Sequence, residues 1–205
     1  MPLSVNLREF IPAAADGPFA ALLDLAPWEI TATAKAIVTR AIAGLSGYDI
    51  ADGVAIHRRA TIEKGAIIKG PAIIGPGCLV AATAYLRDGV FLDENCIVGP
   101  ACELKSVFML KGSKVAHLSF VGDSIIGAGA NIEAGAMIAN YRNERADKRI
   151  RIKTGAGVID TGVDKFGALV GDEARIGANA VIAPGALIAA GAVVPRLALV
   201  DQAPA

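Results

Sequence analysis

The sequence contains few of the side chains that usually fill a thick protein core. Aromatic residues make up only 5% of its 205 residues, although 54% are hydrophobic, and 23 residues are glycine. Most cores rely on aromatic rings, because each ring buries a large apolar area. We therefore expect a core built from alanine and from isoleucine, leucine and valine.

The sequence also lacks an excess of either charge. Twenty basic and twenty acidic side chains give a formal net charge of zero at pH 7. This balance excludes a dominant surface for polyanions, so we expect no nucleic-acid partner. A local basic patch is still compatible with it.

Signals for export and for membrane insertion are missing as well. Arg8, Glu9 and Asp16 interrupt the N-terminal stretch that a signal peptide would need. Residues 176–195 carry no charge and are long enough to span a bilayer. Prolines, glycines and an asparagine interrupt them, however, so we expect no membrane span. The odd number of cysteines, three, favours a reducing cytoplasm.

What the sequence does contain is a six-residue repeat. Every sixth residue from Ile50 to Leu110 is isoleucine, leucine or valine, and the fourth residue after each of the first nine is alanine, valine or cysteine. The pattern returns at Ile126 and again from Val170 to Val194. Neither a helix nor an alternating strand has a period of six. The repeat predicts an all-β fold, in which three short strands and tight corners make a triangular coil and parallel coils stack ~4.8 Å apart.

The three cysteines fall in the small inward positions of this repeat. They are Cys78, Cys96 and Cys102. We interpret them as small buried core thiols rather than catalytic groups. No CxxC or Cys/His spacing typical of zinc sites occurs, and we expect no metal.

A different pattern precedes the repeat. Residues 27–45 predict one helix, with Pro27 in its first turn and Gly44 or Gly47 near its end. The residues before it predict an irregular lead-in. We therefore divide the chain into an N-terminal segment, 1–48, and a β-helix domain, 49–200. The helix would cover an open end of the coil stack or pack beside it.

The repeat fails at two places, and a functional site is best sought there. From Leu110 to Ile126 is sixteen residues rather than eighteen, and Lys114 falls at a small inward position. The second failure is an insertion, 140–169. It has six basic and two acidic side chains between positions 141 and 153, a net charge of +4, and its RIRIK-TGAG-VID run predicts a hairpin. The hairpin either reaches phosphate groups on a cofactor or substrate, in its own or a neighbouring subunit, or is a solvated charged loop.

Three cations are eighteen residues apart and should share one corner of the coil stack. They are Lys69, Arg87 and Lys105. Like charges ~4.8 Å apart repel unless an anion lies between them, and phosphate suits that place. The alternative is that the long side chains splay into solvent. His117 lies inside the first break, where a slip in register can re-aim a side chain. A lone histidine is nevertheless more often structural than catalytic.

Several motifs resemble the acetyltransferase half of the bacterial N-acetylglucosamine-1-phosphate uridyltransferase/glucosamine-1-phosphate acetyltransferase family. They are YLRDG at 85–89, ELK at 103–105, KGSKVAHLSFVGD at 111–123 and GAGANIEAGAMIANY at 127–141. The run at 158–188 is similar to the archaeal-type bifunctional sugar-phosphate enzymes, and LAPWEI resembles their linker helix. The resemblance covers about residues 22–196. It implies a single-stranded, left-handed parallel β-helix of hexapeptide repeats.

The resemblance implies an acetyl-CoA-dependent N-acetyltransferase acting on an amino-sugar phosphate such as glucosamine-1-phosphate. His117 matches the general base that accepts a proton from the sugar amine, a role that suits an imidazole. Arg87 and Lys105 match the pair that binds the sugar phosphate. The family commonly has tyrosine where this chain has Phe120, which loses one polar contact to the substrate.

The remaining matches concern the sugar and the acyl donor, acetyl-CoA. Asn131 matches a sugar-contacting asparagine, and Ala134 a residue whose backbone N–H binds the acetyl carbonyl. The other matched positions are Asn140 and Tyr141 at the acetyl-CoA and sugar site, Ala168 at the cofactor site and Lys148 at the phosphate. Arg142-Asn143 replaces the bacterial Asp-Gly that follows this Asn-Tyr pair.

The resemblance further implies a homotrimer with sites between subunits, in the cytoplasm, and no metal for acetyl transfer. No Gly-rich nucleotidyltransferase motif occurs, so we expect no uridyl transfer. Two alternatives stay open. One is an acyltransferase that acts on another sugar or a nucleotide sugar. The other is a non-catalytic β-helix protein that binds sugar phosphates or serves as a scaffold for a separate nucleotidyltransferase.

Overall fold

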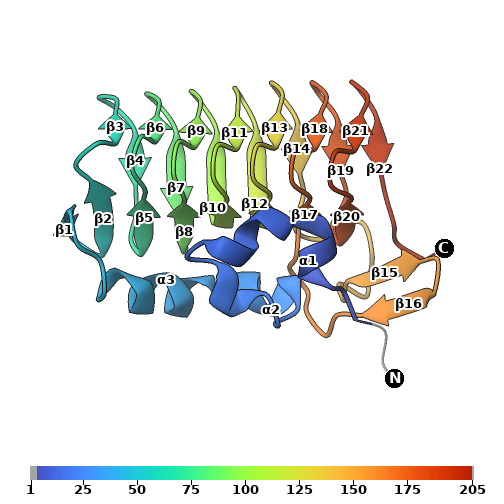
Figure 1. Ribbon diagram of the computed structural model, residues 1–205. Coiled ribbons are helices and arrows are strands. Elements are labelled where there is room, and N and C mark those ends of the chain that lie inside the picture. Colours follow the sequence, from blue (N-terminus) through green and yellow to red (C-terminus); the bar gives the residue numbers. More distant parts are fainter. Residues whose placement is uncertain (1–3, 205) are drawn as a thin grey trace.

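The predicted coil stack is present in the computed structural model, which describes residues 4–204 (Figure 1). The chain winds into a left-handed parallel β-helix, so the predicted fold class is confirmed. Each coil has three faces, which we number in the order in which the chain visits them. Sheets of thirteen and seven strands wrap these faces, and a separate two-stranded sheet forms from the insertion.

The strands of each face are short and stack in register. The first face contains β3 (Thr61–Ile62), β6 (Leu79–Val80), β9 (Ile97–Val98), β11 (Lys114–Val115), β13 (Asn131–Ile132), β18 (Arg175–Ile176) and β21 (Val193–Val194). The second face contains β4 (Ile67–Ile68), β7 (Tyr85–Arg87), the first halves of β10 (Glu103–Met109) and β12 (Phe120–Ile126), β14 (Met137–Ile138), β19 (Val181–Ile182) and β22 (Leu199–Val200). The third face contains β2 (Val54–His57), β5 (Ala72–Ile74), β8 (Val90–Leu92), the second halves of β10 and β12, β17 (Ala168–Val170) and β20 (Ala186–Ile188).

The interior of the coils has the predicted pair of one large and one small side chain per strand. The large positions from Ile56 to Leu104 all face this interior, and the small ones include the three cysteines, which are free and almost fully buried. The interpretation of the cysteines as core thiols is therefore confirmed. Burial raises the pKa of the Cys102 thiol, which keeps it protonated. Ile50 does not belong to the repeat, because β1 (Tyr48–Ala51) folds back antiparallel on β2 and leaves Ile50 half exposed.

The first break in the repeat differs from the prediction. Met109, not Leu110, enters the interior, and Ser113 rather than Lys114 takes the small position. The cause is a shortened corner. In the preceding coil, two residues, Asp88 and Gly89, form this corner, whereas β10 turns on the single residue Ser106. Phe108 therefore pairs with Phe91, only seventeen positions earlier.

A second shortened corner follows in the next coil. There β12 turns on Asp123 alone, and Phe108 pairs with Ile125, again seventeen positions away. Ser106 and Asp123 have φ angles of 54° and 44°, the left-handed region that such corners require. The sixteen-residue gap is thus two separate contractions, both at the corner between the second and third faces.

The N-terminal segment packs beside the stack rather than over its end (Figure 1). The third face presents an unbroken apolar column to it, formed by the outward residues Ala55, Ile73, Phe91, Phe108, Ile125, Leu169 and Leu187. Leu7, Phe19, Trp28, Ile30 and Val38 are buried against this column. Phe19 meets Phe108 edge-on with ring centroids 5.5 Å apart. Aromatic rings are therefore concentrated in this outer core, whereas the described interior of the coils contains none.

The segment is more ordered than predicted. Residues expected to be irregular form α1 (Leu7–Phe10) and the 3₁₀ helices η1 (Pro12–Asp16) and η2 (Ala20–Leu22), while residues 1–3 of that lead-in lie outside the described residues. The single predicted helix is two helices, α2 (Pro27–Ala32) and α3 (Ala34–Ile42). The break is at Thr33, whose hydroxyl donates to the Glu29 carbonyl at 2.7 Å. Such a bond bends a helix away from its regular path.

The insertion forms the predicted hairpin from β15 (Arg151–Thr154) and β16 (Gly157–Asp160). Ile150 and Ile152 are buried against Gly185 of the last coils, so the hairpin is anchored rather than projecting freely. The uncharged stretch 176–195 forms strands of the β-helix. No helix within residues 4–204 is long and apolar enough to cross a membrane.

Close stacking leaves no space for a side chain at several corners, and Gly99 is the sharpest case. A Cβ atom on Gly99 would coincide with the carbonyl oxygen of Ala116 on the next coil. We predict that Gly99→Ala lowers the free energy of unfolding by about 3 kcal/mol, the upper part of the usual range for overpacking. Urea denaturation measures this. Gly155→Ala, where the added Cβ would meet nothing within 4 Å, is the control and should change stability by less than ~0.5 kcal/mol. Equal midpoints for the two variants would contradict the described stacking.

Candidate functional site

The predicted cation column exists at the corner between the second and third faces. Strand pairing puts Arg87 opposite Lys105, and Lys69 is one coil before them. The anions beside these cations are the chain's own carboxylates. Arg87 donates from Nε and Nη2 to Glu103 at 2.8 and 2.7 Å. Lys105 donates to both oxygens of Asp123 at 2.7 and 2.9 Å. Arg87 and Lys105 therefore do not splay freely into solvent, which was one of the two arrangements that the sequence left open, because each pairs with a carboxylate of this chain.

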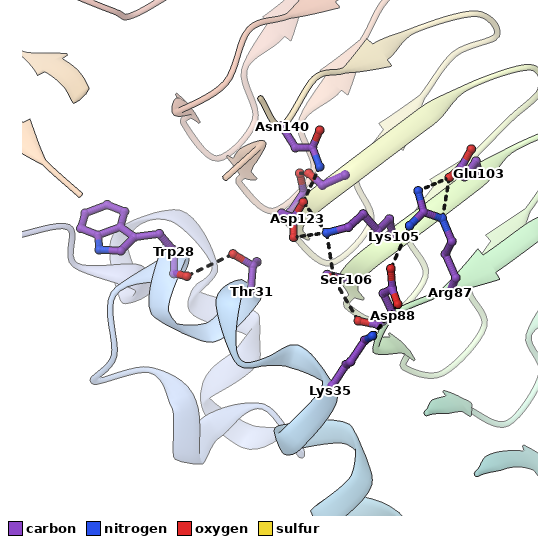
Figure 2. Close-up of polar contacts among 12 residues, drawn as sticks. Trp28, Thr31, Lys35, Arg87, Asp88, Glu103, Lys105, Ser106, Asp123 and Asn140 are labelled. Carbon is purple, nitrogen blue, oxygen red and sulfur yellow. Dashed lines mark hydrogen bonds and ion pairs between the residues drawn. The ribbon is translucent and has the colours of Figure 1, made fainter. Parts of the chain in front are cut away.

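Asp123 is the centre of this polar cluster (Figure 2). Its side chain is only 5% exposed, and that of Lys105 is 16% exposed. The Asn140 amide donates a short hydrogen bond to the same carboxylate. Gly122 allows this approach, since a Cβ there would lie 2.7 Å from the Asn140 amide and 2.9 Å from the Phe120 ring. Lys105, Phe120 and Asn140 are thus brought together at one corner.

Both ends of the insertion meet at this corner. The N–H of Gly167 donates to the Asp123 carbonyl at 2.9 Å, and the N–H of Phe166 donates to the Asn140 carbonyl at 3.1 Å. The last residues of the insertion, just before β17, therefore bring Lys165 to the same corner as Asn140, the first residue of the insertion.

The N-terminal helices complete a pocket of about 280 Å³ over this corner. Lys35 of α3 pairs with Asp88 at 2.6 Å, and its hydrogen bond holds the pKa of that carboxyl below its usual value. The pocket is also lined by Thr31, Lys105, Ser106, Asp123 and Lys165. Among the described residues, Lys165 has no ion pair. Sequence reasoning missed Lys35 and Lys165. The position of Lys165 just before the repeat resumes could have indicated it.

His117 lies at the opposite edge of the second face. It is exposed, its carbonyl accepts from the Gly135 N–H at 2.8 Å, and its side chain makes no hydrogen bond to residues 4–204. The pairing of Lys114 with Asn131 stacks His117 directly on Ala134. About three residues of strand separate this corner from Lys105, roughly 10 Å at the usual rise.

The backbone N–H of Ala134 lacks a hydrogen-bond acceptor in the described part of the chain because the residue before His117 is Ala116, which has no carboxylate. At this corner Glu63 and Glu133 each accept a hydrogen bond from the backbone of the following coil, at Ala82 and Ala178. The equivalent position below Ala134 is Ala116, which has no carboxylate. Within residues 4–204 the Ala134 N–H has no acceptor. A donor next to an exposed imidazole is the arrangement that stabilises a developing oxyanion.

Three further predicted residues, Tyr141, Lys148 and Ala168, do not line the pocket over the Lys105 corner. Tyr141 is 38% exposed, and the Lys148 ammonium lies 5.2 Å from the centre of its ring while donating to the Asn143 carbonyl at 2.8 Å. Lys148 is therefore held on the insertion, whereas Lys165 lines the Lys105 pocket. Ala168 is fully buried, and its N–H donates to the Ser124 hydroxyl at 3.0 Å. Its assignment to a cofactor site stays a prediction.

Arg142 fastens the loop that follows Asn140 and Tyr141. Its guanidinium is 3% exposed and donates to both carboxylate oxygens of Asp201 at 3.0 and 2.7 Å, and to the Pro184 carbonyl at 2.7 Å. Next to Asp201, the Gln202 side chain bonds both the N–H and the carbonyl of Leu187. The C-terminal residues therefore strap the insertion to the last coils. Two carboxylates from outside positions 141–153, Asp160 and Asp201, pair with the cations of the insertion and offset half of its net charge of +4.

Loss of the Asp201 charge should weaken this strap. The hydrogen bond from Arg142 lowers the pKa of Asp201 in the folded protein. The pair therefore stabilises the fold fully above the pKa of an unfolded aspartate, about 3.9. This stabilisation is lost as the pH falls through the lower folded-state pKa. Asp201→Asn leaves the buried Arg142 guanidinium with only the exposed Glu144 carboxylate, 3.4 Å away, as counter-charge, and should cost about 2 kcal/mol at pH 7. Urea unfolding at pH 7 and at pH 3 measures the free energy of unfolding of the wild type and of Asp201→Asn. The difference between these two proteins should be smaller at pH 3. Asp24→Asn, at an exposed pair, should cost less than ~0.5 kcal/mol. A loss no larger than that of Asp24→Asn would contradict the strap.

Comparison with known proteins agrees with this architecture. The family model of the GMPPB C-terminal domain matches residues 70–153. The chain is 36% identical over 139 residues to the bifunctional protein GlmU of Nitratidesulfovibrio vulgaris, covering 63% of this chain and 30% of that protein. It is 34% identical over 157 residues to the bifunctional sugar-1-phosphate nucleotidylyltransferase/acetyltransferase of Sulfurisphaera tokodaii, covering 74% and 39%.

Among solved structures, the chain is similar to the acetyltransferase domain of PglB from Neisseria gonorrhoeae in complex with acetyl coenzyme A. It has 20% identity and a TM-score of 0.45 and covers 89% of this chain and 75% of that one. The chain spans about a third of the length of the curated relatives that it matches. The resemblance that the motifs indicated is confirmed, since most of this chain is similar to the acetyltransferase-like C-terminal part of the GlmU proteins.

Proposed function

We propose that this protein transfers the acetyl group of acetyl-CoA to the amine of an amino-sugar phosphate, with His117 as the general base. One observation carries the proposal. The exposed His117 imidazole and the open Ala134 N–H share one edge of the second face, while the Arg87–Lys105 pair occupies the other edge. The name of the Sulfurisphaera tokodaii relative, which includes acetyltransferase, supports the reaction class.

The reaction requires one proton transfer and no covalent intermediate. The sugar amine attacks the carbonyl carbon of the thioester, so that an N–C bond forms and the C–S bond breaks. His117 accepts the proton that the sugar ammonium loses, and the proton can then pass to the leaving sulfur. The Ala134 N–H donates to the carbonyl oxygen as negative charge develops on it. The thioester is already activated, so no metal is needed.

The sugar phosphate would bind at the Lys105 corner. Lys105 and Arg87 are held there by Asp123 and Glu103, and Lys165 supplies a cation without a carboxylate of its own. We therefore prefer Lys165 to Lys148 as the additional phosphate-binding lysine. Asn140 would contact the sugar, because its side chain lies at the same corner as Lys105.

A second candidate keeps acyl transfer but changes the acceptor to another sugar or a nucleotide sugar. The apolar Phe120 ring beside Gly122 favours it, since a substrate hydroxyl would find no partner on that ring. The non-catalytic alternative, a sugar-phosphate-binding scaffold, is separated from both by the first experiment below.

We further propose that three copies assemble through the second face and close the site between them. Its outward column is almost entirely apolar, broken only by Glu103. The column contains Ile67, Tyr85, Glu103, Phe120, Met137, Val181 and Leu199. Ile67, Met137, Val181 and Leu199 are 54, 44, 42 and 68% exposed. A contiguous exposed apolar stripe is typical of a protein–protein interface.

Replacement of the proposed base should nearly abolish turnover. His117→Ala is expected to lower kcat for acetyl-CoA and glucosamine-1-phosphate by about 10²- to 10⁴-fold, the usual contribution of a general base. Release of free coenzyme A thiol measures it. The fold should persist, because the side chain is exposed. His57→Asn is the control, since His57 is the other histidine of the sequence and lies on the first coil. Unchanged turnover in His117→Ala rules out its role as base, and absence of acetylation by the wild type favours the scaffold.

A charge within the apolar column should separate the subunits. Met137→Asp is expected to shift the mass in solution from three times 20.9 kDa toward that of one chain, because an interfacial carboxylate must lose its water. Light scattering after gel filtration measures this. Val158→Asp, at an exposed hairpin residue outside the column, should leave the mass unchanged. A monomeric wild type would refute the assembly.

A further inference from the structure

Arg142 has an unusual environment for a charged side chain. It follows Asn140 by two residues, and its side chain is only 3% exposed. It donates to both carboxylate oxygens of Asp201 at 3.0 and 2.7 Å and to the Pro184 carbonyl at 2.7 Å. Its Nε atom is buried and has no hydrogen-bond partner among the described residues. A buried donor that stays unpaired lowers stability, so stability alone does not explain this arginine.

Pro184 lies at the corner between the second and third faces, two coils after Asp123. Backbone hydrogen bonds connect the corners of these coils. The Gly167 N–H donates to the Asp123 carbonyl at 2.9 Å, and the Gly185 N–H donates to the Gly167 carbonyl at 2.8 Å. Because Arg142 binds the carbonyl of the residue before Gly185, it ties the start of the insertion to this stack of corners.

Asn140 contacts the same stack of corners. Its side-chain amide donates to the Asp123 carboxylate, and its carbonyl accepts from the Phe166 N–H at 3.1 Å. The same carboxylate holds the Lys105 ammonium (Figure 2). Together with the bonds of Arg142, these contacts close a ring of hydrogen bonds around the point where the insertion leaves the β-helix and rejoins it.

We propose that Arg142 and Asp201 are positioning residues that hold Asn140 at this corner. Asn140 in turn keeps Asp123 paired with Lys105, which would bind the phosphate of the acceptor. The inference rests on the proposed function, in which that phosphate binds here. The loop that contains Arg142 forms no helix or strand before β15, so its conformation depends on side-chain bonds. A loop that is free before binding must be ordered when the ligand arrives, and this cost lowers affinity.

Acceptor binding and acceptor kinetics test this role. Asp201→Asn should weaken the binding of glucosamine-1-phosphate in calorimetry about three- to tenfold, the fold-change expected when one side chain must be ordered again on binding. In turnover, KM for this acceptor should rise by a similar factor while kcat changes little, because the proposed base is untouched. A loss of kcat without a change in KM would refute a positioning role at the acceptor.

A double-mutant cycle with Asn140 shows whether Asp201 acts through it. Asn140→Ala should weaken the binding of glucosamine-1-phosphate by itself. Asp201→Asn/Asn140→Ala should then bind it like Asn140→Ala alone, because a residue that acts only by holding Asn140 has nothing left to hold. Thr161→Val is the control for stability. It removes the 2.7 Å hydrogen bond from the Thr161 hydroxyl to the Ile150 carbonyl, at the base of the hairpin, and should bind the acceptor like the wild type.

The outcomes separate this inference from the proposed function. If glucosamine-1-phosphate binds in an Asp201-dependent way but no acetyl transfer occurs, the positioning role stands and the proposed function falls. If transfer occurs and Asp201→Asn binds this acceptor like the wild type, the positioning role is refuted and the proposed function stands. The role is also refuted if the effects of the two substitutions add in full, if Thr161→Val weakens the acceptor equally, or if the wild type binds no glucosamine-1-phosphate.

Discussion

The thin interior of the coil is the constraint on which the rest of this molecule depends. Each strand can direct only one large and one small side chain inward, and neighbouring coils are joined by backbone hydrogen bonds at a fixed spacing. Every other side chain must point outward, and those on successive coils form straight columns. The chemistry of this protein is therefore arranged in columns. One face is apolar and covered, one is apolar and exposed, and cations are stacked at two places.

The same constraint explains where the aromatic residues are. A ring such as Phe108 does not fit inside a triangular coil, but it fits between the third face and the N-terminal helices. The N-terminal segment thus forms a second core on a surface that the first core cannot enclose. This packing also brings Lys35 to the Lys105 corner. The helices consequently do more than protect the sheet, since they supply a wall of the pocket.

The fold could be predicted from the sequence because the six-residue period repeats over many coils, so that single irregularities do not obscure it. The cysteines were placed correctly for the same reason. The shortened corners at Ser106 and Asp123 were missed, since a deletion of one residue shifts the register without changing the type of residue that follows. Leu110 and Met109 are both apolar, and only the pairing of strands decides which one enters the interior.

The site was predicted only where neighbours in the column are close in sequence. Arg87 and Lys105 are separated by one regular coil, and their adjacency followed from counting. Lys165 reaches the same corner through the insertion, and only its position just before the repeat resumes could have indicated it. Lys35 comes from a helix that packs from outside, so no count along the chain could place it. The carboxylate that pairs with Lys105 could not be predicted from the sequence either. The sequence indicated a column of cations that either holds an anion or splays into solvent. The carboxylate that pairs with Lys105, Asp123, lies in a corner one residue shorter than expected, so the sequence did not reveal it.

The two cation columns show how the same repeat can serve two purposes. A cation held by its own carboxylate is fixed in position, and it costs little to reorganise when a ligand binds, but it has little net charge to attract one. A cation without a counter-charge attracts anions strongly but is held loosely. Arg87 and Lys105 belong to the first kind. Lys114 and Arg175, which flank Asn131 on the first face and form no ion pair within residues 4–204, belong to the second. His117 stands between the columns. Under the proposed function, the first kind would orient a small acceptor beside the imidazole.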